Sequence, residues 1–209
     1  MAKNLDPKCK RCRREGEKLF LKGERCYTPK CSMIRRNYFP GVHGPAGIVG
    51  KSEYYLQLRE KQKAKKIYGL LEKQFRNYFL KASKKKGITD EILMQLLERR
   101  LDNVVFRLGF AKSRMQARQL INHKHFLVND KIVNIPSYQV KQKDKIKLKK
   151  SSIKKPYFSN IIKSLTSETV PKWLKLDTKN LCGEVIDLPT LADIDRRINT
   201  RLIVEYYSR

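Results

Sequence analysis

The sequence lacks any long hydrophobic run. No segment reaches the roughly 18 uncharged apolar residues that a membrane-spanning helix needs. The N-terminus, which begins MAKNLD, also lacks the apolar stretch of a signal peptide. These absences predict a soluble, intracellular chain and argue against a membrane protein.

Acidic residues are scarce. The 209 residues include 48 Lys and Arg but only 20 Asp and Glu, which gives a formal net charge of +28. A surface this positive repels itself in the compact state, and a polyanionic partner relieves that repulsion. The excess is spread over residues 1–150 and becomes thin over residues 151–209. We therefore expect nucleic acid as the partner, bound over a broad surface rather than by one recognition helix.

Patterns that support catalysis are also missing. His43, His123 and His125 have no nucleophile or pair of carboxylates beside them in the sequence. No glycine-rich loop that could cradle a phosphate is present. The sequence therefore predicts that the protein is not an enzyme.

Four cysteines stand close together near the N-terminus. Cys9, Cys12, Cys26 and Cys31 follow the pattern C-x2-C-x13-C-x4-C, in which each pair can converge on one ion and the two pairs complete a tetrahedron. The pattern predicts one structural Zn2+ ion, with an iron–sulfur cluster or disulfides as the alternatives. Four thiolate ligands leave no open position for a catalytic water. Cys182 stands alone, and we assign it no function.

The pattern along the chain predicts an α+β protein with a zinc-stapled start, a helical body and an inserted RNA-binding-type module made of a helix-turn-helix and a small antiparallel sheet. The expected parts are a zinc-binding segment at 1–45, the helical body at 46–98, the module at 99–162, and a C-terminal segment at 163–209 that packs back on the helical body.

Two helices are expected in the helical body. Ser52 is the predicted N-cap of a helix over residues 53–63. The second helix is indicated by apolar residues on one stripe, which are Leu71, Phe75, Tyr78, Phe79 and Ala82.

A further helix is predicted to begin at Thr89 or Asp90 and to continue until Gly109. Its apolar residues recur at helical spacing, and they are Leu101, Val104, Val105 and Leu108. After Gly109, Ser113 and Gln116 form a capping box that opens a new helix with Ala117, Leu120 and Ile121 facing inward.

The start of that last helix is a predicted phosphate site. Lys112, Arg114 and Arg118 are expected on its outside, beside the positive end of the helix dipole.

The apolar period then changes from that of a helix to that of a strand. Residues 126–133 read as a hairpin, because Asn129 and Asp130 tolerate the positive φ of a tight turn. Residues 145–149 alternate between apolar residues and lysine, which predicts a strand with one basic face. Residues 202–207 are expected to form a last strand.

The string LERRLDNVVFRLGF at 97–110, followed by Ser113-Arg114-x-x-Ala117-Arg118-Gln119-Leu120-Ile121 and Val128-Asn129, resembles the RNA-binding module of the small-subunit ribosomal protein four family. The cysteine pattern, the Pro40–Gly44 turn, the segment from Ser52 to Gln62 and the end of the chain resemble the bacterial, zinc-binding form of this family.

The resemblance implies a structural constituent of the small ribosomal subunit in the cytoplasm. Such a protein binds 16S-type rRNA at a junction of several helices, nucleates assembly of the subunit, and lies near the channel through which messenger RNA enters, where it contributes to translational accuracy. Its implied partners are small-subunit rRNA and neighbouring ribosomal proteins, especially small-subunit protein five, with mRNA nearby and no membrane or small-molecule substrate.

The residues expected to contact RNA lie in both halves of the chain. Carried over from the family, the helical hairpin contributes Arg99, Arg100, Lys112, Ser113, Arg114, Arg118, Gln119 and His123. The further candidates are Arg13, Arg14, Arg35, Arg36, Lys51, Tyr55, Arg59, Lys61, Gln62, Asn129 and Lys131.

Two other functions fit parts of the sequence. An RNA-modifying enzyme can carry the same small module, but about 100 residues outside the zinc segment and the module are few for a catalytic domain. A zinc-containing DNA-binding regulator is the second alternative, although its charge would be concentrated on the reading element.

Overall fold

The computed structural model describes residues 5–47, 52–165, 170–193, 195 and 197–209. The chain divides into two compact units, which we call unit 1 (Met1–Leu93 with Asp195–Arg209) and unit 2 (Met94–Ile194). Within the described residues, no helix combines the length and the apolar character that crossing a membrane requires.

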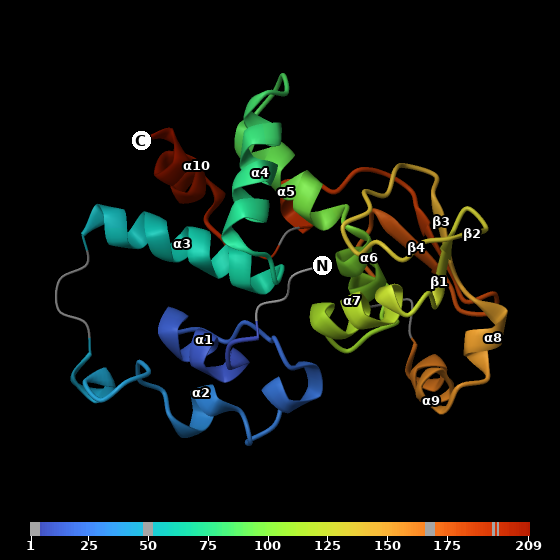
Figure 1. Ribbon diagram of the computed structural model, residues 1–209, viewed down its shortest axis with the longest axis horizontal. Helices are drawn as coiled ribbons and strands as arrows, with labels where there is room; N and C mark the ends of the chain where they lie inside the picture. Colours follow the sequence, from blue (N-terminus) through green and yellow to red (C-terminus); the bar gives the residue numbers. More distant parts are fainter. Residues whose placement is uncertain (1–4, 48–51, 166–169, 194, 196) are drawn as a thin grey trace. The chain divides into compact units, whose positions relative to one another are not determined.

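The described residues of unit 1 form helices and no strand (Figure 1). α5 (Thr89–Glu98) begins in unit 1 and ends in unit 2. The other helices of unit 1 are α1 (Lys8–Glu15), η1 (Gly23–Cys26), α2 (Ser32–Arg35), η2 (Gly44–Ala46), α3 (Glu53–Ile67), α4 (Glu72–Ser83) and α10 (Thr200–Ser208).

The predicted N-cap of α3 is confirmed, since the Ser52 hydroxyl accepts a hydrogen bond of 3.2 Å from the backbone N–H of Tyr55. The helix runs four residues beyond the expected end, to Ile67. The predicted stripe of α4 is also confirmed. Leu71 is its half-buried N-cap, and the buried residues of the helix are Phe75, Tyr78, Phe79 and Ala82.

The prediction that residues 202–207 form a strand is wrong, because they belong to helix α10. α10 packs on α3 and lies beside α4 in Figure 1. Its Ile203 side chain is fully buried, and Tyr207 stacks on Phe79 with ring centroids 4.6 Å apart. Ile203 and Tyr207 are one turn apart, which places them about 6 Å from each other along one face of the helix, whereas in a strand they would be about 13 Å apart.

Unit 2 combines short helices with one five-stranded sheet. Its helices are α6 (Leu101–Arg107), α7 (Arg114–Asn122), α8 (Lys150–Ile153), α9 (Pro156–Ser164) and η4 (Leu191–Asp193). Its strands are β1 (Phe126–Val128), β2 (Lys131–Ile132), β3 (Lys145–Leu148), β4 (Leu174–Asp177) and β5 (Cys182–Val185).

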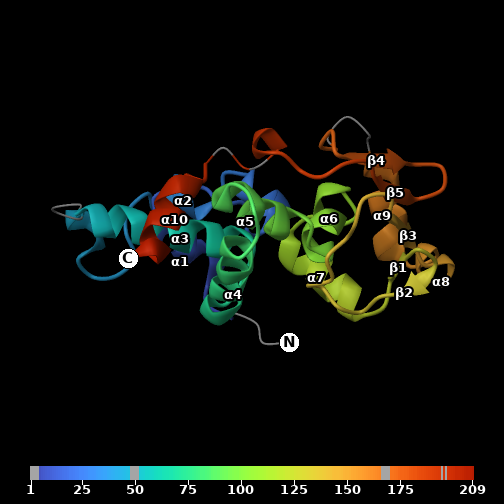
Figure 2. The same cartoon turned by 90° about the horizontal axis from the view of Figure 1, so that it is seen from above.

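The sheet is antiparallel with the order β2-β1-β3-β5-β4, which Figure 2 shows from above. The predicted hairpin is confirmed, with φ of +49° at Asn129 and +63° at Asp130 between β1 and β2. The predicted alternation of β3 is confirmed as well. Ile146 and Leu148 are buried, whereas Lys145 is exposed on the opposite face.

α6 and α7 pack against the apolar face of this sheet (Figure 2). The four apolar residues predicted at α6 are fully buried in the core, and they are Leu101, Val104, Val105 and Leu108. On α7, Ala117 and Ile121 are fully buried in the same core, and Leu120 is partly buried against it. The predicted α+β class is therefore confirmed, since unit 1 is helical in its described residues and unit 2 contains a small antiparallel sheet.

The single helix expected from Thr89 to Gly109 is wrong, because the chain breaks it between α5 and α6. Arg100 has an extended backbone and forms an isolated β-bridge with Gln139. The Leu101 N–H donates to Tyr138 O at 2.9 Å, and the Val140 N–H donates to Arg99 O at 3.0 Å. These long-range backbone hydrogen bonds replace those that a continuous helix would make.

The C-terminal segment expected at 163–209 is divided between the two units. β4 and β5 extend the sheet of unit 2, and Leu174 and Val185 lie buried in its core together with Trp173, the residue before β4. Only residues 195–209 belong to unit 1. The expectation that the whole segment packs on the helical body is therefore wrong, because β5 pairs with β3 and completes the sheet.

Candidate nucleic-acid interface

Two of the predicted RNA-contacting arginines are buried instead. Arg100 is 2% exposed and Arg118 is 3% exposed, and both guanidinium groups bind Asp102, which is also buried. Arg100 donates to Asp102 through Nε at 3.0 Å and Nη2 at 2.8 Å. Arg118 donates to Asp102 Oδ2 through Nε at 3.0 Å and Nη2 at 2.6 Å. The expectation that Arg118 lies on the outside of α7 is therefore wrong, because its guanidinium group pairs with the buried carboxylate of Asp102.

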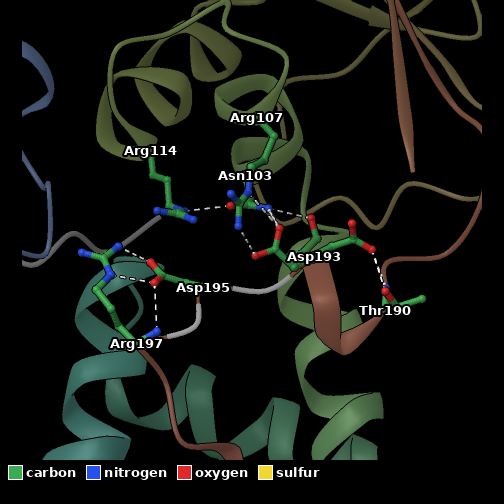
Figure 3. A network of polar contacts seen from close by, with 8 residues as sticks. Asn103, Arg107, Arg114, Thr190, Asp193, Asp195 and Arg197 are labelled. Carbon is green, nitrogen blue, oxygen red and sulfur yellow. Dashed lines mark hydrogen bonds and ion pairs between the residues drawn. The ribbon is translucent and has the colours of Figure 1, made fainter. Parts of the chain in front are cut away.

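A second polar network fixes the start of α7, and Figure 3 shows Arg114 pointing at the amide of Asn103. Arg114 Nε donates to Asn103 Oδ1 at 2.7 Å, and its guanidinium lies 4.7 Å from the ring centroid of Phe106. The Asn103 amide donates to the buried Glu98 carboxylate at 2.7 Å, and Arg107 binds the same carboxylate at 3.0 Å and 3.2 Å. Arg114 is thus half-buried and oriented by Asn103.

The side chains of Arg99 and Ser113 form hydrogen bonds with backbone groups. Arg99 Nε donates to Val140 O at 2.8 Å, which ties the residue after α5 to the segment between β2 and β3. The Ser113 hydroxyl accepts from the Gln116 N–H at 3.3 Å, so the predicted N-cap is confirmed. The Gln116 side chain accepts from the Lys112 N–H rather than from Ser113, one residue earlier than a capping box predicts.

Three predicted contacts at α7 face solvent. Gln119 and the C-cap His123 are exposed one turn apart on one side of the helix, and Lys112 is exposed just before the helix, where the half-buried Gln116 side chain accepts from its N–H. We call these four residues the α7 surface. Asn129 and Lys131 are exposed at the β1–β2 hairpin, where Asn129 also donates to Asp144 at 2.8 Å.

In unit 1 the predicted contacts separate into exposed and engaged cations. Arg14, Arg35 and Arg36 are exposed. Arg13 donates to Tyr38 O at 2.9 Å and to Phe39 O at 3.1 Å, so it holds the turn after α2. Lys51 lies outside the described residues.

On α3, two predicted contacts are occupied by carboxylates. Lys61 is buried, and it binds Glu72 at 2.7 Å and lies 4.4 Å from the Tyr206 ring centroid. Arg59 binds Glu15 at 3.3 Å and lies over the half-buried Tyr55 ring at 5.7 Å. Gln62 is half-buried, and it lines a hollow of about 530 Å³ between α1 and α3.

The sequence reasoning missed several cations that the same hollow brings together. Lys10 and Arg11 line it from α1, and Lys65 and Lys66 line it from α3. Lys10 and Arg14 are one helical turn apart, and so are Gln62 and Lys66, so periodicity among the polar residues could have found both faces.

The four N-terminal cysteines converge on one small cavity. All four line a space of about 10 Å³, close to the volume that one water molecule or small ion occupies. Burial raises the pKa of the Cys12 thiol, and its closeness to Cys26, Cys9 and Cys31 raises it further. Among the described residues, however, no three side chains of the metal-binding types already have the arrangement of a formed site. Four thiols are a donor set that zinc accepts. Their positions in this structure do not form a tetrahedron.

Two known protein domains match the chain. Residues 3–98 match the Ribosomal protein S4/S9 N-terminal domain, and residues 99–146 match the S4 domain. The chain is 56% identical to the small ribosomal subunit protein uS4 of Heliobacterium modesticaldum and 57% identical to that of Caldicellulosiruptor saccharolyticus. It is 53% identical to the same protein of Syntrophomonas wolfei, and all three alignments cover 100% of both chains. The chain belongs to the family of small ribosomal subunit protein uS4.

Proposed function

We propose that this protein is a structural constituent of the small ribosomal subunit that binds 16S-type rRNA through exposed groups on preorganised elements. The observation that carries the proposal is the α7 surface, which lies within the part of the chain that matches the S4 domain. Its exposed groups extend from the residue before the N-cap of α7 to the C-cap His123, and the inner side of the helix is fixed by buried ion pairs. A rigid polar surface of this kind recognises folded RNA by shape, phosphates and 2′-hydroxyls.

Within this proposal the predicted RNA-contacting residues have two different roles. Lys112, Gln119, His123 and Lys131 contact RNA directly, whereas Arg100 and Arg118 position α6 and α7 through Asp102. Arg114 combines the roles, because its Nε is held by Asn103 while the side chain remains partly exposed.

The test is the salt dependence of binding to small-subunit rRNA and to duplex DNA. We expect tight, strongly salt-dependent binding to the rRNA and weak binding to the DNA. The pair Lys112→Gln with Lys131→Gln should lower the slope of log K against log salt by about one to two, since each phosphate contact contributes roughly 0.7 to 0.9.

The matched control is Lys172→Gln with Lys179→Gln, which removes the same charge from exposed positions near β4. It should leave the slope nearly unchanged. Equal affinity for rRNA and DNA would contradict the proposal and would favour the DNA-binding regulator. Turnover of an RNA nucleotide would favour the RNA-modifying enzyme.

We further propose that Cys9, Cys12, Cys26 and Cys31 hold one Zn2+ ion. The ion would supply a cross-link between α1 and the segment that carries η1 and α2, in a region with few buried apolar side chains. Lys8, Lys22 and Arg25 line the same cavity as the cysteines, and their positive charge would offset the negative charge of a zinc ion bound by four thiolates.

Elemental analysis of freshly purified protein should find one zinc per chain. Cys26→Ser should lose the metal and the protease resistance of residues 5–47, whereas Cys182→Ser should retain both. Absence of stoichiometric metal from the parent protein would contradict this proposal, and stoichiometric iron would favour the cluster.

The family resemblance also supports finer roles, which we propose together. The protein nucleates assembly at a junction of several rRNA helices, lies near the entrance for messenger RNA where it contributes to accuracy, and touches small-subunit protein five. Co-sedimentation with small subunits from cytoplasm, followed by chemical cross-linking, should recover rRNA, protein five and messenger RNA. Recovery of none of these with the small subunit would contradict the placement.

A further inference from the structure

The hollow between α1 and α3 gathers several cations of unit 1 around one concave surface. α1 and α3 contact each other and lie side by side in Figure 1. The volume of about 530 Å³ falls within the roughly 300 to 1,000 Å³ of small-ligand pockets. Its basic lining residues are Lys10, Arg11, Arg14, Lys65 and Lys66.

The cations reach this hollow from two helical faces. Lys10 and Arg14 are one turn apart on α1, and Gln62 and Lys66 are one turn apart on α3. Lys10 and Arg14 are exposed, and neither has a carboxylate partner among the described residues. Their charge is therefore available to an anion that enters between the helices.

The carboxylates nearby are shared and cannot neutralise the site. Glu72 accepts from both Lys65, at 2.8 Å, and Lys61. Glu15 accepts from both Lys66 and Arg59. Burial lowers the pKa of Lys66, and although Glu15 raises it, the neighbouring Arg59 and Lys65 lower it further. Each carboxylate thus serves two cations, which leaves a net positive charge around the hollow.

The remaining lining consists of one carboxylate, Asp6, which pairs with Arg11 at 3.6 Å, and of apolar or neutral groups. Pro7, Pro40 and Leu70 supply apolar surface, and Gln62 supplies an amide that can both donate and accept hydrogen bonds. A free phosphate would use only the cations. A nucleotide would also cover the apolar surface with its sugar and base, and it would offer a 2′-hydroxyl or a base edge to the Gln62 amide.

We propose that this hollow, which we call the α1–α3 site, binds a single RNA nucleotide that projects from the folded RNA. Its phosphate lies between Lys10, Arg14 and Lys65, and its base or sugar covers Pro40 and Leu70. The inference rests on the proposed function, because it assigns to unit 1 a defined binding site within a larger RNA contact. A basic hollow alone also suits an acidic peptide, but the apolar lining favours the nucleotide.

The first experiment follows the backbone amides of the isotope-labelled full-length protein by NMR during titration with adenosine 5′-monophosphate. Saturable shifts are expected on α1 and α3, with a Kd of about 1 mM or below. Inorganic phosphate should bind at least about tenfold more weakly, a difference of roughly 1.4 kcal/mol. A hexaglutamate peptide should not compete with the nucleotide.

The second experiment compares two charge-matched double variants. Lys10→Gln with Arg14→Gln removes the unpaired cations of the α1–α3 site, and both residues are exposed, so the helix should be retained. Lys84→Gln with Lys85→Gln removes the same charge from exposed residues after α4. The first pair should abolish the nucleotide shifts and weaken rRNA binding by about tenfold, whereas the control pair should retain the shifts and weaken rRNA binding by less than about threefold.

The proposal is overturned if the nucleotide causes no saturable shift, if phosphate or hexaglutamate binds equally well, or if both variants weaken rRNA binding to the same extent. In each of these cases the parent protein still binds rRNA, so the proposed function is unaffected. Failure of the parent protein to bind rRNA would instead remove the proposed function.

Discussion

Arg114 and Arg118 lie one turn apart on α7, yet they have different neighbours and different roles. Arg118 is buried against Asp102, whereas Arg114 is held at the surface by Asn103. At the residue scale, the role of each cation is therefore decided by the acceptor that it meets. A buried guanidinium paired with a carboxylate cannot also bind a phosphate without breaking its ion pair.

Asp102→Asn should strongly destabilise unit 2, because it leaves the buried guanidinium groups of Arg100 and Arg118 without their carboxylate. Breaking a buried pair typically costs about 3 to 5 kcal/mol of unfolding free energy. Urea denaturation followed by circular dichroism measures the change. The exposed control Gln119→Ala should alter the stability by less than about 0.5 kcal/mol. A stable Asp102→Asn variant with weakened RNA binding would mean that the cluster acts on RNA directly.

Glu72 makes the stability of unit 1 depend on pH. Burial raises the pKa of this carboxyl group, but hydrogen bonds from Lys61 and Lys65 outweigh burial and lower it from 4.5 to about 2. A lowered pKa in the folded state means that the carboxylate stabilises the fold fully above its unfolded pKa, and that this stabilisation is lost as the pH falls toward 2. Since nearly half of the side chain is exposed, solvent reduces the size of the effect.

Glu72→Gln should therefore be less stable than the parent protein near neutral pH, and the difference should shrink as the pH falls from about 4.5 to about 2. Urea denaturation at several pH values measures this difference. Glu53→Gln, which removes an exposed carboxylate from α3, should change the stability by less than about 0.5 kcal/mol throughout. A pH-independent difference between Glu72→Gln and the parent protein would contradict the assignment.

At the element scale, helix α10 shows how packing overrides local preference. Its sequence is rich in β-branched and aromatic residues, which favour strands, and that composition explains the incorrect strand prediction. The helix forms because it turns Ile203 and Tyr207 toward α3 and α4. The break at Arg100 has the same origin, since backbone groups at residues 136–140 satisfy the ends of α5 and α6.

Ile203→Ala should loosen α10 from α3. Truncation of a buried Ile costs about 2 to 5 kcal/mol, and a terminal helix can respond by local unfolding. Hydrogen exchange should become fast throughout α10 while the amides of β1, β3 and β5 keep their protection. Arg201→Ala, at an exposed position of the same helix, is the control. Unchanged protection of α10 in the Ile203→Ala variant would show that other contacts hold the helix.

At the scale of the whole molecule, the sheet of unit 2 is completed by strands β4 and β5, which the sequence pattern assigned to a separate C-terminal segment. β5 pairs with β3, and β4 pairs with β5, so residues 174–185 complete a sheet that begins at residue 126. Trp173 and Val185 belong to the same core as α6 and α7. A module that ends at residue 162 would leave the edge of β3 unpaired and this core open.

A fragment of residues 89–194 should therefore fold cooperatively, whereas a fragment of residues 99–162 should aggregate or remain unfolded. Thermal denaturation and hydrogen exchange of the two purified fragments distinguish these results. The longer fragment should also bind rRNA with a smaller salt slope than the full chain, because it lacks the cations of unit 1. Cooperative folding of the shorter fragment would contradict the need for β4 and β5.

The sequence by itself determined the features that depend on composition or on neighbours within about one helical turn. These include the expectation of a polyanionic partner from the +28 charge, the caps at Ser52 and Ser113, the stripe of α4 and the hairpin at Asn129. Each follows from local hydrogen bonding or from side-chain periodicity, which the linear order of residues records directly.

Only the tertiary structure decided which cations remain exposed, how α10 folds, where β4 and β5 pair, and how α1 and α3 form their hollow. These features depend on residues that are far apart in the chain. Arg118 pairs with Asp102 instead of lying on the predicted RNA surface, because a buried charge is costly unless it is paired. The surrounding fold, rather than the residues next to Arg118 in the sequence, determines that burial.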